Sequence, residues 1–181
     1  MNQGLVNGLV RRNKLQTHLA RRRARETREL SAGEVGKLSE RELLLIGVAL
    51  YWAEGYKKSV IKNGKERTFH AISFTNTDPA MVRLFVRFLT EIIHLPQSKI
   101  RFHVRLFPHI NEDDALRYWL EASGLPEESA LKPTVVTSVS SLRKRPFNRL
   151  PYGVVQIRAC DTKNFYRIMG WIDGIKQFVT V

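Results

Sequence analysis

GVALYWAEG, residues 47–55, is the stretch that decides the fold, because it joins an apolar helix to a single acid. Small residues recur in it at three positions, Gly47, Ala49 and Ala53. Its acid, Glu54, stands directly before the terminal glycine. A helix that has no polar face must be covered on most of its sides. The surroundings of Glu54 therefore distinguish a buried structural helix from a helix that carries a functional site.

The limits of this helix are readable from its flanks. Ser39 and Glu42 have the capping-box spacing, in which each side chain accepts a backbone N–H at the helix start. Gly55 is suited to a left-handed helix stop. These signals predict a helix over residues 40–54. Its apolar residues leave no polar side: Leu43, Leu44, Leu45, Ile46, Val48, Leu50, Tyr51 and Trp52.

Composition indicates the kind of partner. The 181 residues include 30 Lys and Arg against 17 Asp and Glu, a formal net charge of +13, and the pI is near 10.3. A polyanion is the natural partner for such a chain, and nucleic acid is the commonest polyanion. A single cysteine, Cys160, excludes an intrachain disulfide and a zinc site built from several cysteines.

The sequence also indicates the cellular compartment of the protein. A chain with one cysteine suits a reducing cytoplasm. The longest apolar run, 43–53, is shorter than the ~20 residues that a membrane span needs, and the N-terminus lacks the pattern of a signal peptide. We expect a cytoplasmic protein without a membrane partner, associated with the nucleoid if the source is prokaryotic.

The composition of residues 1–38 predicts a basic N-terminal arm, which precedes a domain over residues 39–181. Within the arm, residues 11–28 hold eight Lys or Arg and one acid, Glu26, which supplies seven of the thirteen net charges. The composition favours helix but offers few side chains to a core. We interpret the arm as a solvated or phosphate-binding segment.

The remaining pattern alternates strands and helices. Strands are predicted at 57–62 and 69–76 around the basic turn NGKER, then at 99–107 and 153–160. Helices are predicted from the cap Asp78 to near Pro96, over 111–124, and from the cap Asp161 to residue 175. Residues 132–152 show no strand pattern. This order predicts an α+β fold, with an antiparallel sheet, helices packed on one face, and the helix over 111–124 placed before the last strand.

Residues 47–55 and the elements that follow resemble the LAGLIDADG homing endonucleases. The small residues Ala49 and Ala53 match the two small positions of the family's motif, Glu54 matches its acid and Gly55 its last glycine. Gly47 replaces the first leucine, and Tyr51 and Trp52 are bulkier than the pattern. The segment IMGWIDGI, 168–175, looks similar but has Ile175 at the acidic position, so it is interpreted as core packing.

The resemblance implies a saddle-shaped sheet that lies in the DNA major groove, and a pair of motif helices that pack on each other. One motif copy implies a homodimer, with an interface that includes Ile46, Ala49, Leu50 and Ala53. Glu54 is then the catalytic and metal-binding residue. Two such acids, one from each copy, would hold Mg²⁺, a hard cation that prefers oxygen ligands, if the protein is catalytically active.

One face of the predicted sheet is basic and polar, which favours contact with double-stranded DNA. Its expected DNA-binding residues, with a basic loop near residue 144, are Ser73, Thr75, Arg101, His103, Arg105, Gln156, Arg158, Arg143, Lys144 and Arg145. Arginine pairs naturally with guanine and glutamine with adenine in the major groove.

Two function classes stay open at this point. One is a metal-dependent DNA endonuclease, and the other is a noncatalytic DNA-binding protein such as a transcription regulator. A third and weaker alternative is an RNA-binding protein, which the charge alone would allow. Aromatic side chains on the polar face would favour RNA, and the predicted outward positions hold none.

Overall fold

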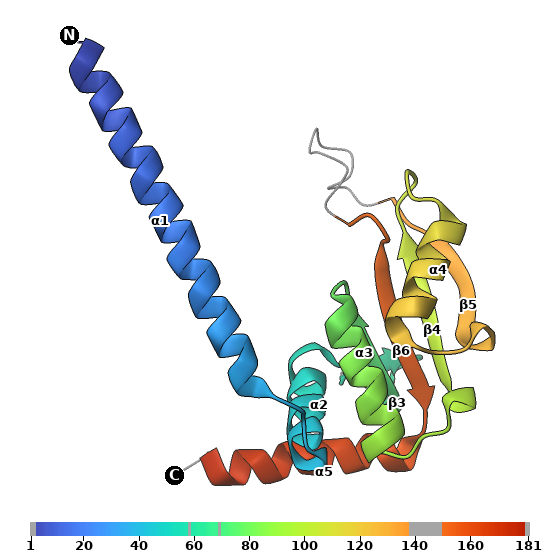
Figure 1. Ribbon diagram of the computed structural model, residues 1–181. Helices are drawn as coiled ribbons and strands as arrows, with labels where there is room; N and C mark the ends of the chain where they lie inside the picture. The colour runs from blue at the N-terminus through green and yellow to red at the C-terminus, as the bar shows by residue number, and fades with distance from the viewer. Residues whose placement is uncertain (1–2, 58, 69, 138–149, 180–181) are drawn as a thin grey trace. The chain divides into compact units, whose positions relative to one another are not determined.

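A computed structural model describes residues 3–57, 59–68, 70–137 and 150–179, and the statements below refer to these residues (Figure 1). The chain divides into two units, residues 1–39 and residues 40–181. The first unit contains helix α1, Gln3–Val35. From residue 7 to residue 35 every side chain except Leu19 is exposed. Helix α1 therefore offers almost no side chain to a core, as its composition predicted.

The second unit contains four further helices and six strands. The helices are α2 (Glu40–Glu54), α3 (Pro79–Arg87), α4 (Glu112–Ser123) and α5 (Thr162–Val179). The strands are β1 (Ser59–Lys62), β2 (Lys65–Thr68), β3 (Ala71–Asn76), β4 (Ile100–Leu106), β5 (Ala130–Val135) and β6 (Val154–Cys160). A π-helical turn, Phe88–Ile92, continues α3, and short 3-10 turns precede β4 and β5. The coarse prediction of an α+β fold is confirmed.

Side-chain caps fix most of these limits. The Asp78 carboxylate accepts from the backbone N–H groups of Ala80 and Met81, and the Asn111 side chain accepts from the N–H of Asp114. At the start of α5, Asp161 does the same for Asn164. Each such cap satisfies donors that the first helical turn leaves without a partner. The three predicted helix starts are confirmed.

The sheet is mixed, and in this respect the prediction of an antiparallel sheet was wrong. The strand order is β3-β6-β4-β5. Strand β6 is antiparallel to both β3 and β4, whereas β5 runs parallel to β4. Strand β5 lies in a segment that was predicted to be poor in strands. It lacks alternating burial and has Pro133 in its interior, and proline is tolerated there because β5 is an edge strand.

Strands β1 and β2 form a separate two-stranded hairpin. Lys62 pairs with Lys65, so the loop consists of Asn63 and Gly64 alone. Both residues have positive φ, 55° and 70°, as the common two-residue hairpin turn requires. The turn is therefore shorter than the predicted NGKER segment, because Lys65, Glu66 and Arg67 already pair in β2.

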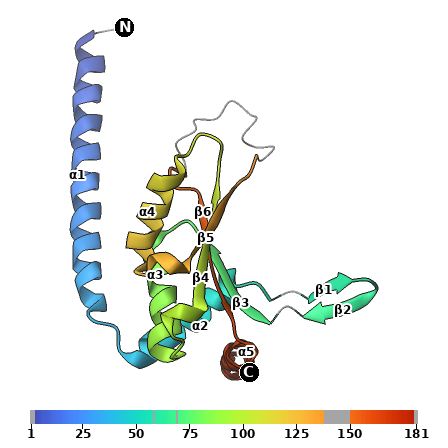
Figure 2. The same cartoon turned by 90° about the vertical axis from the view of Figure 1, so that its right-hand side faces the viewer.

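One face of the four-stranded sheet forms the core, and helices cover it (Figure 2). The alternation predicted for β4 and β6 is confirmed. The buried apolar residues at alternate positions of β3, β4 and β6 are Ile72, Phe74, Ile100, Phe102, Val104, Leu106, Val155, Ile157 and Ala159. The apolar residues Val82, Phe85 and Val86 of α3 are buried as well. The opposite face of the sheet is left for polar side chains.

Helix α2 is seated against this core by close aromatic packing. Phe85 stacks on Phe74 with ring centroids 4.3 Å apart, and its ring also neighbours those of Tyr51 and Phe88 at 6.2 and 5.8 Å. A Cβ at Gly47 would lie 2.2 Å from two atoms of the Phe88 ring. Glycine stands at this position because the Phe88 ring occupies the space of a side chain.

We expect Gly47→Ala to destabilise the second unit. Alanine favours a helix over glycine by about 1 kcal/mol, but overpacking against Phe88 costs about 1–3 kcal/mol, so the net effect is a loss. The control is Gly170→Ala in α5, where an added Cβ meets nothing within 4 Å, and which should raise stability. Urea unfolding at one protein concentration measures both. Equal stabilisation by the two substitutions would contradict this packing.

Gly55 ends α2 for a different reason from the one predicted. It does not adopt the left-handed conformation. Instead it pairs with Phe74 of β3, and its N–H donates to the carbonyl of Tyr51 at 2.8 Å. A Cβ at Gly55 would lie 2.4 Å from that carbonyl oxygen and from the Tyr51 ring. Close approach, not φ, requires the glycine.

Candidate nucleic-acid interface

The strand register gathers the seven outward residues predicted on the sheet onto one face. The rows that cross this face, taken from β3 through β6 and β4, are Ser73–Arg158–Arg101 and Thr75–Gln156–His103. A third row joins Val154, Arg105 and Thr134 across β6, β4 and β5. We call these nine residues the polar face. It carries three arginines and no acid, so its formal charge is +3 before His103 is counted.

Charge is not spread evenly over the polar face. Arg101 and Arg158 lie directly opposite each other on antiparallel strands. The neighbouring row of Thr75, Gln156 and His103 has no formal charge with a neutral imidazole. Like charges placed opposite each other destabilise a sheet by themselves, so the arginine pair is a position where an anionic partner would be favourable.

Ser73 is less accessible than predicted. Its side chain is only 3% exposed, because Gln156 lies over it and donates from Nε2 to the Ser73 Oγ at 2.9 Å. The backbone carbonyl of Ser73 accepts from the N–H of Tyr56 at 2.9 Å. Ser73 therefore orients Gln156 and does not offer its own hydroxyl to a base, which corrects its predicted role.

A hydrogen bond to Thr134 holds the His103 side chain in place. Its Nε2 lies 2.7 Å from the Thr134 Oγ1 of β5. Burial, and secondarily the neighbouring charge of Arg105, lower the pKa of His103 below its usual 6.5. Both effects favour the neutral imidazole. Thr134 was missed in the sequence because it belongs to β5, the strand that has no alternating pattern.

At the end of α2, Glu54 is exposed, and a lysine lies beside the helix terminus. The Lys57 Nζ donates to three backbone carbonyls, those of Tyr51 at 3.0 Å, Trp52 at 2.9 Å and Gly55 at 2.6 Å. Burial lowers the pKa of Lys57, and the charge of Glu54 opposes this shift. Lys57 was not among the predicted site residues, although a lysine just beyond a helix end is typical of carbonyl capping.

The oxygen atoms at the end of α2 do not form a Mg²⁺ site within one chain. The ion needs several oxygen ligands in near-octahedral geometry, and the end of α2 offers one carboxylate. The carbonyls beside that carboxylate already accept from the ammonium of Lys57. Among the described residues no group of three His, Cys, Asp or Glu is placed to hold a metal ion. A magnesium site here would need a second carboxylate from another copy of the chain.

The outer side of α2 is apolar and is exposed to solvent in the part of the chain that the structure describes. Leu45 and Trp52 are each 40% exposed, and Ala49 and Ala53 are exposed as well. We call these four residues the α2 outer face. Ile46 and Leu50, also predicted at the interface, are half-buried beside it. The expectation that α2 is covered on most sides is therefore not met by the described residues.

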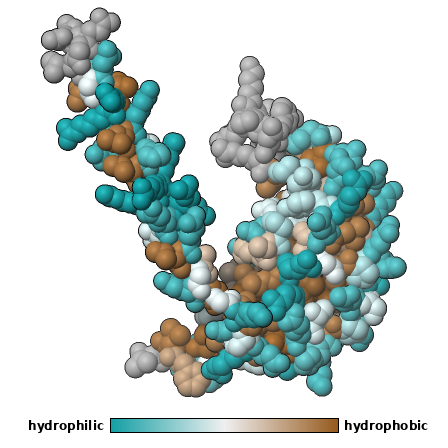
Figure 3. Space-filling view, in the orientation of Figure 1, coloured by the Kyte–Doolittle hydropathy of each residue, from teal (hydrophilic) through white to brown (hydrophobic). Residues whose placement is uncertain are grey.

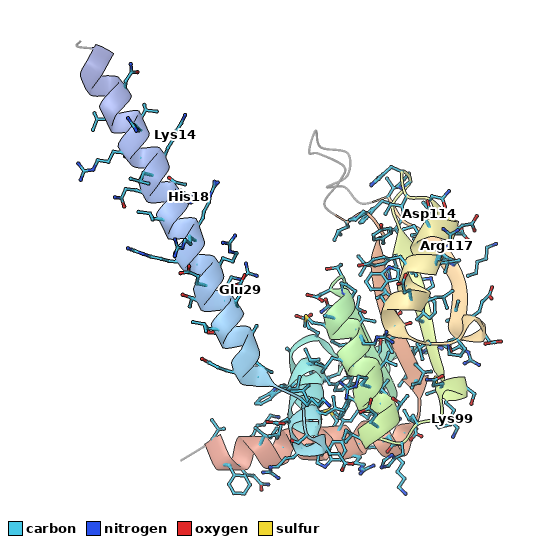
Figure 4. The ribbon with its side chains drawn as sticks, viewed as in Figure 1. Lys14, His18, Glu29, Lys99, Asp114 and Arg117 are labelled. Carbon is cyan, nitrogen blue, oxygen red and sulfur yellow. The ribbon has the colours of Figure 1, made fainter. Side chains whose placement is uncertain are left out.

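Two further basic regions flank the candidate interface in the sequence. The predicted loop residues Arg143, Lys144 and Arg145 lie outside the described residues. Helix α1 carries its cations on exposed side chains, and Lys14 and His18 project from it into solvent (Figure 4). In Figure 3 its surface is mainly hydrophilic, with isolated apolar side chains. No helix in the described part of the chain is both long and apolar enough to span a membrane.

Known proteins give no guide to the function of this chain. No family model, no curated protein and no solved structure matches the chain. The resemblance to LAGLIDADG proteins stays a prediction, and the function has to be inferred from the polar face, the end of α2 and the α2 outer face.

Proposed function

We propose that the chain is a noncatalytic double-stranded DNA-binding protein, such as a transcription regulator, that places its polar face in the major groove as a homodimer. The observation that carries the proposal is the strand register. It aligns Arg101, Arg105 and Arg158 on a face without acids, while helices cover the other face. Arginine forks suit guanine edges and phosphates.

The LAGLIDADG-like architecture is part of this proposal. Three features support it: the α2 helix with an acid at its end, the pairing of Gly55 and Tyr56 with β3, and the order of strands around β6. The parallel strand β5 and helix α4 are additions to the architecture that the resemblance implies. We therefore propose a member of this class whose sheet is extended at one edge.

RNA is the weaker candidate because of the side chains on the polar face. Proteins that read RNA sequence commonly stack bases on aromatic side chains. The polar face holds no Phe, Tyr or Trp, and it presents arginine, glutamine, threonine and histidine instead. These are groups that read base edges in a duplex.

A salt titration of the full chain tests the proposal. Fluorescence anisotropy with a labelled DNA duplex, an RNA duplex and a DNA single strand should show the tightest binding to the DNA duplex. The affinity should fall linearly on a log–log plot against salt. Tighter binding to either competitor at every salt concentration would contradict the proposal.

The basic helix α1 should strengthen binding to every duplex without selecting sequence. In a variant with Arg11, Arg12, Arg21 and Arg23 all changed to Gln, the slope of log affinity against log salt should fall by up to about 3.6, because each lost phosphate contact removes about 0.9. Two unrelated duplexes should lose affinity equally. A slope that matches the wild type would show that α1 does not contact phosphate.

Magnesium should not be required. With Lys57 already bonded to the carbonyls at the end of α2, we expect the duplex affinity in Mg²⁺ to be no higher than in EDTA, and the duplex to stay intact after long incubation. Gel electrophoresis of a tightly bound duplex measures both. Mg²⁺-dependent cutting that disappears in Glu54→Gln would overturn the noncatalytic assignment and support the endonuclease.

A further inference from the structure

The polar face ends in an open pocket at the start of β4. The pocket has a volume of about 490 Å³ and is lined by Ser98, Lys99, Arg101, Leu131, Arg158 and Cys160. This volume lies within the range of about 300–1,000 Å³ that is common for small-ligand sites. Lys99, which directly precedes β4, lies at this end of the sheet (Figure 4).

The pocket is lined by three cations and no acid. Arg101 and Arg158 face each other across β4 and β6, and Lys99 adds a third charge from the preceding turn. The Nη1 of Arg101 donates to the carbonyls of Ser98 and Ile100, at 2.6 and 3.1 Å. These bonds hold the guanidinium at the pocket wall, so little side-chain entropy remains to be lost when an anion binds.

The rest of the polar face differs in kind from the pocket. In the next row Gln156 and His103 each make a hydrogen bond to a hydroxyl, those of Ser73 and Thr134. These groups are neutral and oriented, as base readout requires, whereas the pocket concentrates charge, as phosphate binding requires. The two zones are adjacent, because Arg158 and Gln156 are two residues apart on β6.

We propose that this pocket binds a phosphate group of the duplex backbone and thereby sets the register in which the Gln156 row meets the base edges. The proposal rests on the proposed function for the source of the phosphate. The pocket itself depends only on the chemistry of Lys99, Arg101 and Arg158. The arginines supply forked donors that match phosphate oxygens, and the lysine supplies a point charge.

Cys160 gives a direct readout of occupancy. It is the single cysteine of the chain, it is exposed, and it lines the pocket. Neutral iodoacetamide, followed by the mass of the intact protein, therefore reports on this site alone. With a DNA duplex at about 100 times its dissociation constant, about 1% of the pockets stay empty, and alkylation should slow by at least tenfold.

Two variants and two further ligands separate the outcomes. Arg101→Gln with Arg158→Gln should lose protection at a duplex concentration that saturates the variant, each rate being compared with that of the same variant alone. Lys132→Gln removes a cation from β5 next to Leu131 that does not line the pocket, and should keep full protection. Inorganic phosphate and a nucleoside monophosphate should protect weakly and in proportion to concentration.

Each result decides one proposal. If the duplex binds but Cys160 reacts at the rate of the free protein, the pocket proposal fails and the proposed function stands. If no duplex binds while phosphate or the nucleotide protects Cys160, the pocket holds a free phosphorylated ligand and the proposed function fails. Protection that survives the double arginine variant would show that the duplex covers Cys160 without using the pocket, and would overturn the inference.

Discussion

Replacing Arg101, Arg105 and Arg158 together by Gln should lower the affinity for a preferred DNA duplex by at least about 100-fold, because each specific arginine contact contributes about 1–3 kcal/mol. The three side chains come from two strands that the register places side by side on the polar face. The loss should be larger for the preferred duplex than for an unrelated one.

A matched control separates this effect from bulk charge. Changing Arg83, Arg117 and Lys132 to Gln lowers the formal charge by the same three, from +13 to +10. Arg83 and Arg117 stand on the helices that cover the other face of the sheet. This control should keep its sequence preference. Equal losses in the two variants would mean that the polar face attracts DNA only through net charge.

The fold should survive the triple substitution. Arg101 and Arg158 are like charges directly opposite each other, and such pairs destabilise a sheet. Because the substitution removes this repulsion and keeps a polar side chain at each position, we expect no large drop in the melting temperature, as thermal unfolding by circular dichroism would show. A large drop in melting temperature would mean that the variant reports on folding and not on DNA contact.

The second large effect is expected at the α2 outer face. Ala49 lies at the centre of this surface, between Leu45 and Trp52 along the helix. If a second copy covers it, Ala49→Glu buries a charge without a partner, which costs about 3–5 kcal/mol. The dissociation constant of the homodimer should then rise at least about 100-fold.

Sedimentation at micromolar concentration measures this change. The wild type should be a dimer and Ala49→Glu a monomer, while the control Ala80→Glu, on an exposed position in the first turn of α3, should stay dimeric. A wild type that is monomeric both with and without duplex would contradict the dimer.

Figure 3 shows further apolar surface at the C-terminal end of α5, where Phe178 is 88% exposed.

Regular periodicity made much of the fold predictable. The alternation over 100–106 placed Ile100, Phe102, Val104 and Leu106 in the core and the arginines on the other face, because successive side chains of a strand point to opposite sides. The caps Asp78, Asn111 and Asp161 were readable for an equally local reason.

Features that depend on contacts between distant residues were not predictable. Strand β5 gains its partner from β4 and has no periodic pattern of its own. Gly47 is required by the approach of Phe88, 41 residues away in the sequence, which no local signal records. The burial of Ser73 follows from a bond to Gln156, 83 residues away in the sequence.

The residues of the candidate site were predictable from the sequence, but their grouping on the sheet was not. The sequence placed the seven outward residues on one face, and only the register shows that Arg101 and Arg158 form a pair while Gln156 and His103 form a neutral row. At the end of α2 the acid was evident from the sequence, whereas the three bonds of Lys57 depend on the folded path of residues 51–57.

The central claim, that the polar face reads double-stranded DNA as a homodimer, is tested most directly by selection from a random-sequence duplex library with the full chain in Mg²⁺, followed by sequencing of bound and cut molecules. We predict that the bound pool converges on one sequence with two-fold symmetry, since a symmetric dimer contacts two equivalent half-sites, and that the selected duplexes stay uncut. A bound pool as diverse as the starting library would contradict the claim.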